Sequence, residues 1–332
     1  MKKQIKRGFV TVATGKYYCW LAENLLISYR LFCDHRYPFY LITDEEGKGF
    51  LKETFDGIIV MKDSKRNYLD KLHIYDNTPF EETIFIDADC HIVSDISYLF
   101  DEFENNGADI STIGKLHKIT PETPPYNYGM AAVEHFGIKE YMAFNGGIYY
   151  FKQSERASQC LDFIFNDIIP NYEKYDLLVK KYLISSTNKG WGDEPIFGVA
   201  TRVFDFPPLW IEGRDVLKYF GMQMEKLHWD MDKKVCTAMW RGEKVSPEII
   251  HYATYNTRTL EYINWNIKLR GRYKKTWKPI VRIKIIFADI AWAFKPKQLK
   301  AFFKWVGAHF TISHFKYRCG QIKRLFTKKR GK

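Results

Sequence analysis

The sequence lacks the features that mark several classes of protein. Its six cysteines are scattered and form no Cys-x-x-Cys pair, so we expect neither a disulfide framework nor a cysteine zinc site. Residues 1–8 are basic, but no long apolar stretch follows them, so no signal peptide is predicted. No apolar run reaches the ~20 residues of a transmembrane helix, and no internal repeat is evident. These absences favour a globular chain with reduced thiols, as in a cytosol.

Acidic residues are almost missing from the C-terminal part of the chain. Residues 268–332 hold 20 Lys or Arg and a single acid, Asp289, whereas residues 1–267 hold 31 basic and 38 acidic residues. The net charge of +12 therefore comes from the C-terminal part alone. We divide the chain into a mildly acidic body, residues 1–267, and a basic tail, residues 268–332.

Large apolar residues recur at helical spacing in this tail, in two stretches separated by Pro296. They are Ile280, Ile283, Phe287, Ile290 and Phe294, then Leu299, Phe302, Phe303, Val306 and Phe310. Basic amphipathic helices of this kind lie on anionic membrane surfaces, so we expect a cytoplasmic protein held peripherally on the inner face of the cell membrane. The alternative is that the apolar stripes pack on the body. Nucleic acid is a less favoured partner, because no recognition motif accompanies the charge.

The body alternates between strand and helix patterns. Strand patterns cover residues 9–13, 39–43, 58–61, 83–86, 110–113 and 148–151, and helical patterns cover residues 18–32, 65–75, 156–169 and 172–183. This order predicts an α/β fold with a mostly parallel central sheet and helices on both faces. In such sheets ligands bind beyond the carboxyl ends of the strands.

An acidic pair follows one of these strand patterns. Asp87 and Asp89 come directly after the apolar residues 83–86. Alternate residues of an extended chain point to one side, so both carboxylates can face one divalent cation. Oxygen ligands suit Mg2+ or Mn2+, which keep positions open for phosphate groups. The alternative is an ordinary solvated turn, but the apolar flanks favour a metal site that serves a nucleotide diphosphate.

Further motifs accompany the acidic pair. In order they are residues 9–14 (FVTVAT), 71–73 (KLH), 86–89 (IDAD), 144–147 (FNGG), 192–194 (GDE) and His251. Their order and approximate spacing resemble glycogenin and the related bacterial retaining glycosyltransferases, including lipopolysaccharide galactosyltransferases, over about residues 8–255. The resemblance implies a single nucleotide-sugar-binding domain of the glycosyltransferase A (GT-A) type with an Asp-x-Asp (DXD) motif. It also implies Mn2+ or Mg2+ as the cofactor and a UDP-sugar as the donor.

The resemblance also implies roles for individual residues. Metal ligands would be Asp87, Asp89 and His251, and the catalytic residues near the reacting sugar would be Asp193 and Glu194. The implied donor-binding residues are Val12, Thr14, Tyr18, Lys71, Asp87, Asn145, Gly146, Gly147 and Arg258. Each type of residue also has an ordinary structural explanation. Tyrosines at a helix start pack, Asn-Gly is a frequent turn, a lone histidine is commonly structural, and acids at a helix start act as caps.

The chain departs from the family pattern at three places. Gly15 stands where the family has Asn, and Glu194 stands where it usually has Gln. After His251 the family has a lysine that contacts the diphosphate; here that position is Thr257, and the adjacent Arg258 is a candidate substitute. A carboxylate at position 194 leaves two retaining mechanisms open, front-face attack and a covalent sugar intermediate.

The resulting expectation is a hexosyltransferase that moves a sugar from a UDP-sugar to a glycan or lipid-linked acceptor, in cell-surface polysaccharide or lipopolysaccharide synthesis. One alternative is a nucleotidyltransferase that makes sugar nucleotides. It is disfavoured because no Gly-rich phosphate loop with basic residues follows the first strand. Another is a binding protein without turnover, which retention of the acidic motifs argues against.

Overall fold

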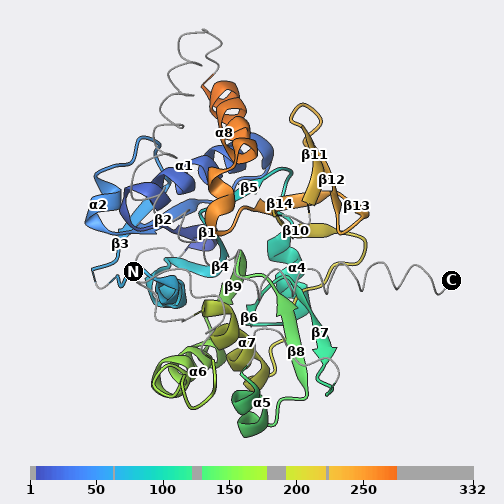
Figure 1. The fold of residues 1–332 in the computed structure, drawn as a ribbon. Coiled ribbons are helices and arrows are strands. Elements are labelled where there is room, and N and C mark those ends of the chain that lie inside the picture. The colour runs from blue at the N-terminus through green and yellow to red at the C-terminus, as the bar shows by residue number, and fades with distance from the viewer. Residues whose placement is uncertain (1–4, 63, 122–128, 178–191, 222–223, 275–332) are drawn as a thin grey trace, which may run out of the picture. The chain divides into compact units, whose positions relative to one another are not determined.

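A six-stranded sheet lies at the centre of the fold, with strand order β3-β2-β1-β4-β9-β6 (Figure 1). Its strands are β1 (Ile5–Val12), β2 (Phe39–Thr43), β3 (Gly57–Val60), β4 (Phe80–Ile86), β6 (Ile110–Ser111) and β9 (Ile148–Lys152). The neighbours from β3 to β4 pair in parallel, whereas β9 is antiparallel to both β4 and β6. The predicted α/β class with a mostly parallel sheet is therefore confirmed.

The computed structural model describes residues 5–62, 64–121, 129–177, 192–221 and 224–274, which belong to one compact unit. Of the predicted tail, residues 268–274 form the end of the last helix, and residues 275–332 lie outside the described residues. None of the helices described is both long enough and apolar enough to cross a membrane.

Helices cover both faces of the central sheet, because its inner strands are apolar on both sides. In β1, the neighbours Phe9 and Val10 point to opposite faces and both are fully buried. The Phe9 ring packs against Tyr29 of α1 and Phe100 of α4, with centroids 5.2 and 5.0 Å apart. Val10 belongs to the core on the other face, which includes residues of α6 and α7 such as Phe197.

The helices and the smaller sheets complete the described unit. The helices are α1 (Gly15–Phe32), α2 (Glu45–Lys48), α3 (Ile74–Asn77), α4 (Leu99–Asn106), α5 (Met130–Phe136), α6 (Glu155–Phe163), α7 (Asp193–Val203) and α8 (Leu260–Tyr273), with 3-10 helices η1 (Tyr68–His73) and η3 (Thr254–Arg258) and the π-helix η2 (Ile164–Ile168). The smaller sheets are β10-β14-β5, β11-β12-β13 and β7-β8. Their strands are β5 (Cys90–Ile92), β7 (Gly114–Lys118), β8 (Glu140–Phe144), β10 (Asp215–Tyr219), β11 (Met224–Asp230), β12 (Val235–Trp240), β13 (Glu243–Val245) and β14 (Pro247–His251).

The end of the body is anchored by α8, which packs on α1. Arg270 Nε donates to Asn24 Oδ1 over 2.8 Å, and His91 Nε2 of β5 lies 2.8 Å from Asn266 Oδ1. Closer to the C-terminus, Arg272 pairs with Asp232 at 2.6 Å. The first residues of the predicted basic tail therefore make contacts with the body.

Two predicted helices differ from the structure. In the range 65–75, residues 65–67 are not helical and Tyr68–His73 forms the 3-10 helix η1. The pattern at residues 172–183 predicts a helix, but residues 172–176 form turns, and residues 178–183 lie outside the described part. The backbone of Asp176 adopts φ +50°, a left-handed conformation that stops a right-handed helix.

Candidate functional site

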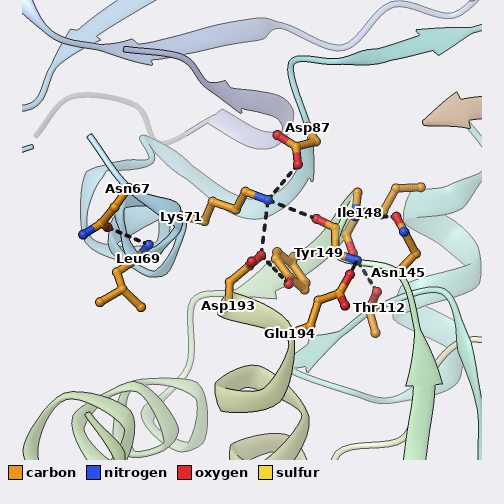
Figure 2. Close-up of polar contacts among 12 residues, drawn as sticks. Asn67, Leu69, Lys71, Asp87, Thr112, Asn145, Ile148, Tyr149, Asp193 and Glu194 are labelled. Atoms are coloured by element: carbon orange, nitrogen blue, oxygen red, sulfur yellow. Dashed lines mark hydrogen bonds and ion pairs between the residues drawn. The ribbon is translucent and has the colours of Figure 1, made fainter. Parts of the chain in front are cut away.

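The candidate site lies where β4 ends and β9 begins (Figure 2). The two strands are antiparallel with Ile86 opposite Ile148, so residues just before β9 lie beside residues just after β4. The Asp87 backbone N–H donates to the Gly147 carbonyl over 2.9 Å. The helix η1, the strand β14 and the start of α7 bring the other side chains of the site to the same place.

The acidic pair forms a turn and does not continue the strand. The Cys90 N–H donates to the Asp87 carbonyl over 3.0 Å, and the two residues between them form the turn that joins β4 to β5. The expectation that an extended chain aligns both carboxylates is therefore wrong. They converge nevertheless, since His251 Nε2 lies 3.0 Å from Asp89 Oδ1 and 3.7 Å from Asp87 Oδ2. The cause is the pairing of β5 with β14, which sets Cys90 opposite His251.

Asn145 determines which nitrogen of His251 carries the proton of the neutral ring. Asn145 Oδ1 accepts the Gly147 backbone N–H over 3.0 Å, so this atom is the amide oxygen. The same oxygen lies 2.5 Å from His251 Nδ1, which must therefore be the donor. Nε2 then directs its lone pair toward the aspartates. Metal-binding histidines are commonly held this way, with the second ring nitrogen donating to an oxygen.

Lys71 is a buried cation between two carboxylates (Figure 2). Its side chain is 10% exposed, and its Nζ lies 2.7 Å from Asp87 Oδ2 and 3.2 Å from Asp193 Oδ2. Burial lowers the pKa of Lys71, but Asp193 and Asp87 raise it more, so the pKa stands well above its ordinary value. The amine is therefore charged, as a lysine that binds phosphate must be.

Asp193 and Glu194 are the first two residues of helix α7. Glu194 Oε1 accepts the Gly146 backbone N–H over 2.7 Å, and Asp193 Oδ2 accepts the Tyr149 hydroxyl over 2.7 Å. Acids in the first turn of a helix are stabilised by the helix dipole. Burial raises the pKa of Glu194, and the charge of Asp193 raises it further. Both acids thus face the Asn-Gly-Gly segment and the end of β4.

The charge balance of the site favours a bound cation. Carboxylates of Asp87, Asp89, Asp193 and Glu194 gather around two basic groups, the Lys71 amine and the His251 imidazole. Burial raises the pKa of Asp87; at Asp89 the nearby imidazole outweighs burial and lowers the pKa. Asp89 Oδ1 is buried, and His251 Nε2 lies 3.0 Å from it; burial lowers the pKa of His251, but Asp89 raises it more. A buried carboxylate oxygen that faces a nitrogen lone pair is repelled unless a proton or a metal cation lies between them.

Two sets of ligand atoms are available at this point. Asp89, Cys90 and His251 offer atoms that lie within 4.8 Å of one another. Burial and then the charge of Asp89 raise the pKa of Cys90 well above its ordinary value, so its thiol stays protonated and binds metal poorly. Asp87 Oδ2, which also faces the imidazole, is the better third ligand. Carboxylate oxygens with one imidazole fit Mn2+ or Mg2+.

Other predicted donor-binding residues lie at the carboxyl end of β1, the strand next to β4. Val12 ends β1 and is half-buried, Thr14 precedes α1, and Tyr18 in the first turn of α1 is 51% exposed. Within the described residues, no hydrogen bond or ion pair joins these three to the charged cluster. Gly15 has φ +69°, a conformation that glycine and asparagine adopt most readily, so the departure from the family's Asn preserves the backbone here.

Arg258 lies beside the start of α1. Its guanidinium carbon is 5.6 Å from the centre of the Tyr17 ring, and the Tyr17 hydroxyl shares a 2.7 Å hydrogen bond with Thr257. Thr257 is 2% exposed, whereas Arg258 is half-buried. Of these two neighbours, Arg258 is therefore the more exposed.

The sequence prediction missed Tyr149, whose hydroxyl contacts Asp193. Its position in an apolar strand pattern is typical of a core residue, and its ring is indeed fully buried. The available signal was chemical, because a buried tyrosine normally needs a partner for its hydroxyl.

No protein-family model matches the sequence, and no curated protein matches it. The solved structures that resemble it include three glycosyltransferases. The galactosyltransferase LgtC, in complex with donor and acceptor sugar analogues, is 8% identical with a TM-score of 0.48, over 82% of this chain and 96% of LgtC. Mouse xyloside xylosyltransferase 1, in its apo form, is 15% identical with a TM-score of 0.41, over 66% of this chain and 89% of that one.

The third is the glycosyltransferase GlyE of Streptococcus pneumoniae TIGR4, 13% identical with a TM-score of 0.39 over 63% of this chain. That match spans only 45% of the GlyE chain. Similarities at these identities and TM-scores do not by themselves assign an activity to this protein.

Proposed function

We propose that this chain is a metal-dependent glycosyltransferase of the GT-A type. It moves a hexose from a UDP-sugar to a glycan or lipid-linked acceptor, with retention at the anomeric carbon. The product belongs to cell-surface polysaccharide or lipopolysaccharide synthesis.

The convergence of Asp87, Asp89 and His251 carries this proposal. The aspartates and the imidazole are distant in sequence, yet their ligand atoms approach to 3.0 and 3.7 Å. Lys71 touches the same Asp87 and also Asp193 at the start of α7. A cation site, a charged lysine and an acid pair side by side form an arrangement suited to a sugar diphosphate.

Each group has a role in the proposed transfer. Asp87, Asp89 and His251 would hold Mn2+ or Mg2+, which when bound neutralises the diphosphate and stabilises the leaving UDP. Lys71 places a further positive charge where negative charge grows as the phosphate departs. Gly146 and Gly147 have no side chains, so the side chains of Asp193 and His251 can pack directly against this backbone. The Glu194 carboxylate, held by the Gly146 N–H, faces the positive charge that develops on the sugar ring.

In the front-face mechanism, the bonds that break and form are balanced without a further reactant. The bond between the anomeric carbon and the diphosphate oxygen breaks, and the acceptor oxygen forms its bond on the same face of the sugar. The acceptor proton passes to the departing diphosphate. The covalent version would instead use a carboxylate as the nucleophile, and Glu194 is the candidate for it.

A panel of UDP-sugars tests the proposal. The purified protein is incubated with each donor and Mn2+, and released UDP is measured. We expect hydrolysis of one donor that stops in EDTA and in Asp89→Ala. Tight UDP binding without turnover of any donor would indicate a binding protein, and pyrophosphate-dependent formation of UTP would indicate a nucleotidyltransferase.

We also propose that residues 268–332 attach the enzyme to the anionic inner face of the cell membrane. The charge of this segment supports the proposal. A chain truncated after Lys274 tests it, because it keeps the contact of Arg270 with Asn24 and the ion pairs of Arg272 and Lys274 with the body. We expect it to lose sedimentation with anionic liposomes and to keep donor hydrolysis. Unchanged sedimentation would contradict attachment through this segment.

A further inference from the structure

Tyr149 is a buried tyrosine whose orientation is fixed. It is fully buried on β9, and its ring lies 4.1 Å from that of Phe197 on α7 and 5.8 Å from that of Phe85 on β4, centroid to centroid. Its hydroxyl donates to Asp193 Oδ2 over 2.7 Å. The ring packs between strand and helix, and this packing holds the hydroxyl beside Asp193.

The oxygen that Tyr149 contacts also contacts Lys71. Asp193 Oδ2 lies 3.2 Å from Lys71 Nζ, which approaches Asp87 Oδ2 more closely, at 2.7 Å. The Lys71 amine therefore contacts both carboxylates and lies nearer Asp87, the proposed metal ligand. The hydroxyl supplies Asp193 with a second donor, so Asp193 does not need to draw the amine away from Asp87.

We propose that the Tyr149 hydroxyl is a positioning group for catalysis. It orients the Asp193 carboxylate toward the donor sugar and keeps Lys71 on the Asp87 side, where the phosphate lies. This inference rests on the proposed function and extends it, since it concerns how the sugar side and the phosphate side of the site are kept apart.

Gly146 supports the same inference. A Cβ atom at this position would lie 2.7 Å from the Tyr149 hydroxyl and 3.0 Å from Asp193 Oδ2. It would also lie 3.1 Å from Glu194 Cγ. The backbone at Gly146 therefore packs directly against Tyr149, Asp193 and Glu194. There is no room for a side chain at position 146. Packing this tight keeps the hydroxyl and the carboxylate in one arrangement.

The adjacent residue offers a matched control. Tyr150 is as fully buried as Tyr149 but points to the opposite face of the sheet, where its hydroxyl donates to the buried Glu82 over 3.2 Å. Tyr149→Phe and Tyr150→Phe each remove one hydroxyl from a buried carboxylate and keep the ring. They differ in which carboxylate loses its donor.

The test measures donor hydrolysis, UDP binding and structure for both variants. For Tyr149→Phe we expect kcat to fall about 10- to 100-fold, the loss typical of one hydrogen bond to a charged group, with UDP affinity in Mn2+ changed less than about 2-fold. For Tyr150→Phe we expect kcat within about 2-fold of the wild type and a comparable loss of thermal stability. Crystal structures should show Asp193 and Lys71 displaced only in Tyr149→Phe.

Two outcomes separate the inference from the function on which it rests. Equal kcat in the two variants of an active enzyme, or an unmoved Asp193 in Tyr149→Phe, overturns the role of Tyr149 and leaves the proposed function intact. A wild type that neither binds nor hydrolyses any UDP-sugar overturns the proposed function and the catalytic role of Tyr149 together.

Discussion

Two charged clusters on opposite faces of the central sheet have the same components and different balances. In the Arg7 cluster, Arg7 of β1 meets the buried Glu82 of β4, which also accepts the Tyr150 hydroxyl. In the candidate site, Lys71 meets the buried Asp193, which accepts the Tyr149 hydroxyl. Each cluster thus contains a basic residue, a buried acid and a tyrosine of β9.

The surroundings of the two cations differ. Arg7 donates to Glu82, Asp101 and Glu104 over 3.2, 2.6 and 2.5 Å, and the last two side chains are 69% and 44% exposed, so water solvates their remaining charge. Around Lys71 the acids are mostly enclosed, with the Asp193 and Asp87 side chains 8% and 19% exposed. In the Arg7 cluster, side chains of the protein and water therefore satisfy the charges. The candidate site places several enclosed carboxylates beside one lysine and one imidazole, a set of groups that can hold a bound cation.

Removing a proposed metal ligand should have the largest effect. Asp89→Asn keeps the shape of the side chain and removes its charge, so we expect calorimetry to show no Mn2+-dependent tightening of UDP binding and kcat/KM to fall about 1000-fold. Asp101→Asn, in the Arg7 cluster, is the matched control and should leave both quantities unchanged. Mn2+ binding by Asp89→Asn at wild-type affinity would show that Asp89 is not a metal ligand.

Exchanging each cation for an apolar side chain comes next. Lys71→Met should lower kcat/KM about 100-fold, because the site loses a charge that stabilises the departing phosphate. Arg7→Met should leave kcat/KM unchanged and lower the free energy of unfolding by about 3 kcal/mol, since it breaks a mostly buried ion pair. Donor hydrolysis and urea unfolding of both variants measure this difference. If Arg7→Met impaired hydrolysis as much as Lys71→Met, the division into a structural and a functional cluster would be wrong.

A smaller effect is expected from the glycine that abuts His251. A Cβ atom at Gly147 would lie 2.9 Å from His251 Nδ1 and 3.0 Å from Asn145 Oδ1. Gly147→Ala should therefore disturb the hydrogen bond that orients the imidazole and weaken Mn2+ binding about 10- to 100-fold. Gly271→Ala in α8 is the control, because within the described part of the chain no atom beyond the adjacent helix backbone lies within 4 Å of its Cβ position, and it should leave Mn2+ affinity unchanged. An unaltered affinity in Gly147→Ala would argue that His251 is not a ligand.

Long apolar runs were the most predictable parts of the fold. The cores of β1, β2, β4 and β9 follow from such runs, and the start of α7 follows from the acids before a proline. The strand β11 (Met224–Asp230) was not predicted, since four of its seven residues are charged or histidine and it pairs with its neighbour β12 in the chain. Short polar strands depend on local pairing that periodicity does not reveal.

The sequence predicted which residues form the site better than it predicted their arrangement in space. Resemblance pointed to Asp87, Asp89 and His251, but the aspartates approach the imidazole through a turn and the β5–β14 pairing. Tyr149 could not be assigned, because the partner of its hydroxyl depends on how α7 packs against β9. A contact between distant elements leaves no pattern along the chain.

The mildest change concerns Glu194, one of the acids around Lys71. Glu194→Gln keeps the oxygen that accepts the Gly146 N–H, so the loop should stay in place and kcat should fall only about 10-fold if the role is electrostatic. Burial and Asp193 raise the pKa of Glu194, so ionising it costs free energy in the folded state, and that cost is absent at low pH and grows as the pH rises. Glu194→Gln should therefore unfold at a higher temperature than the wild type at pH 8, with the difference vanishing as the pH falls through the ordinary range of glutamate. Calorimetric scans across pH and donor kinetics together measure both effects, whereas a glycosylated Glu194 trapped by mass spectrometry would replace the electrostatic role with a nucleophilic one.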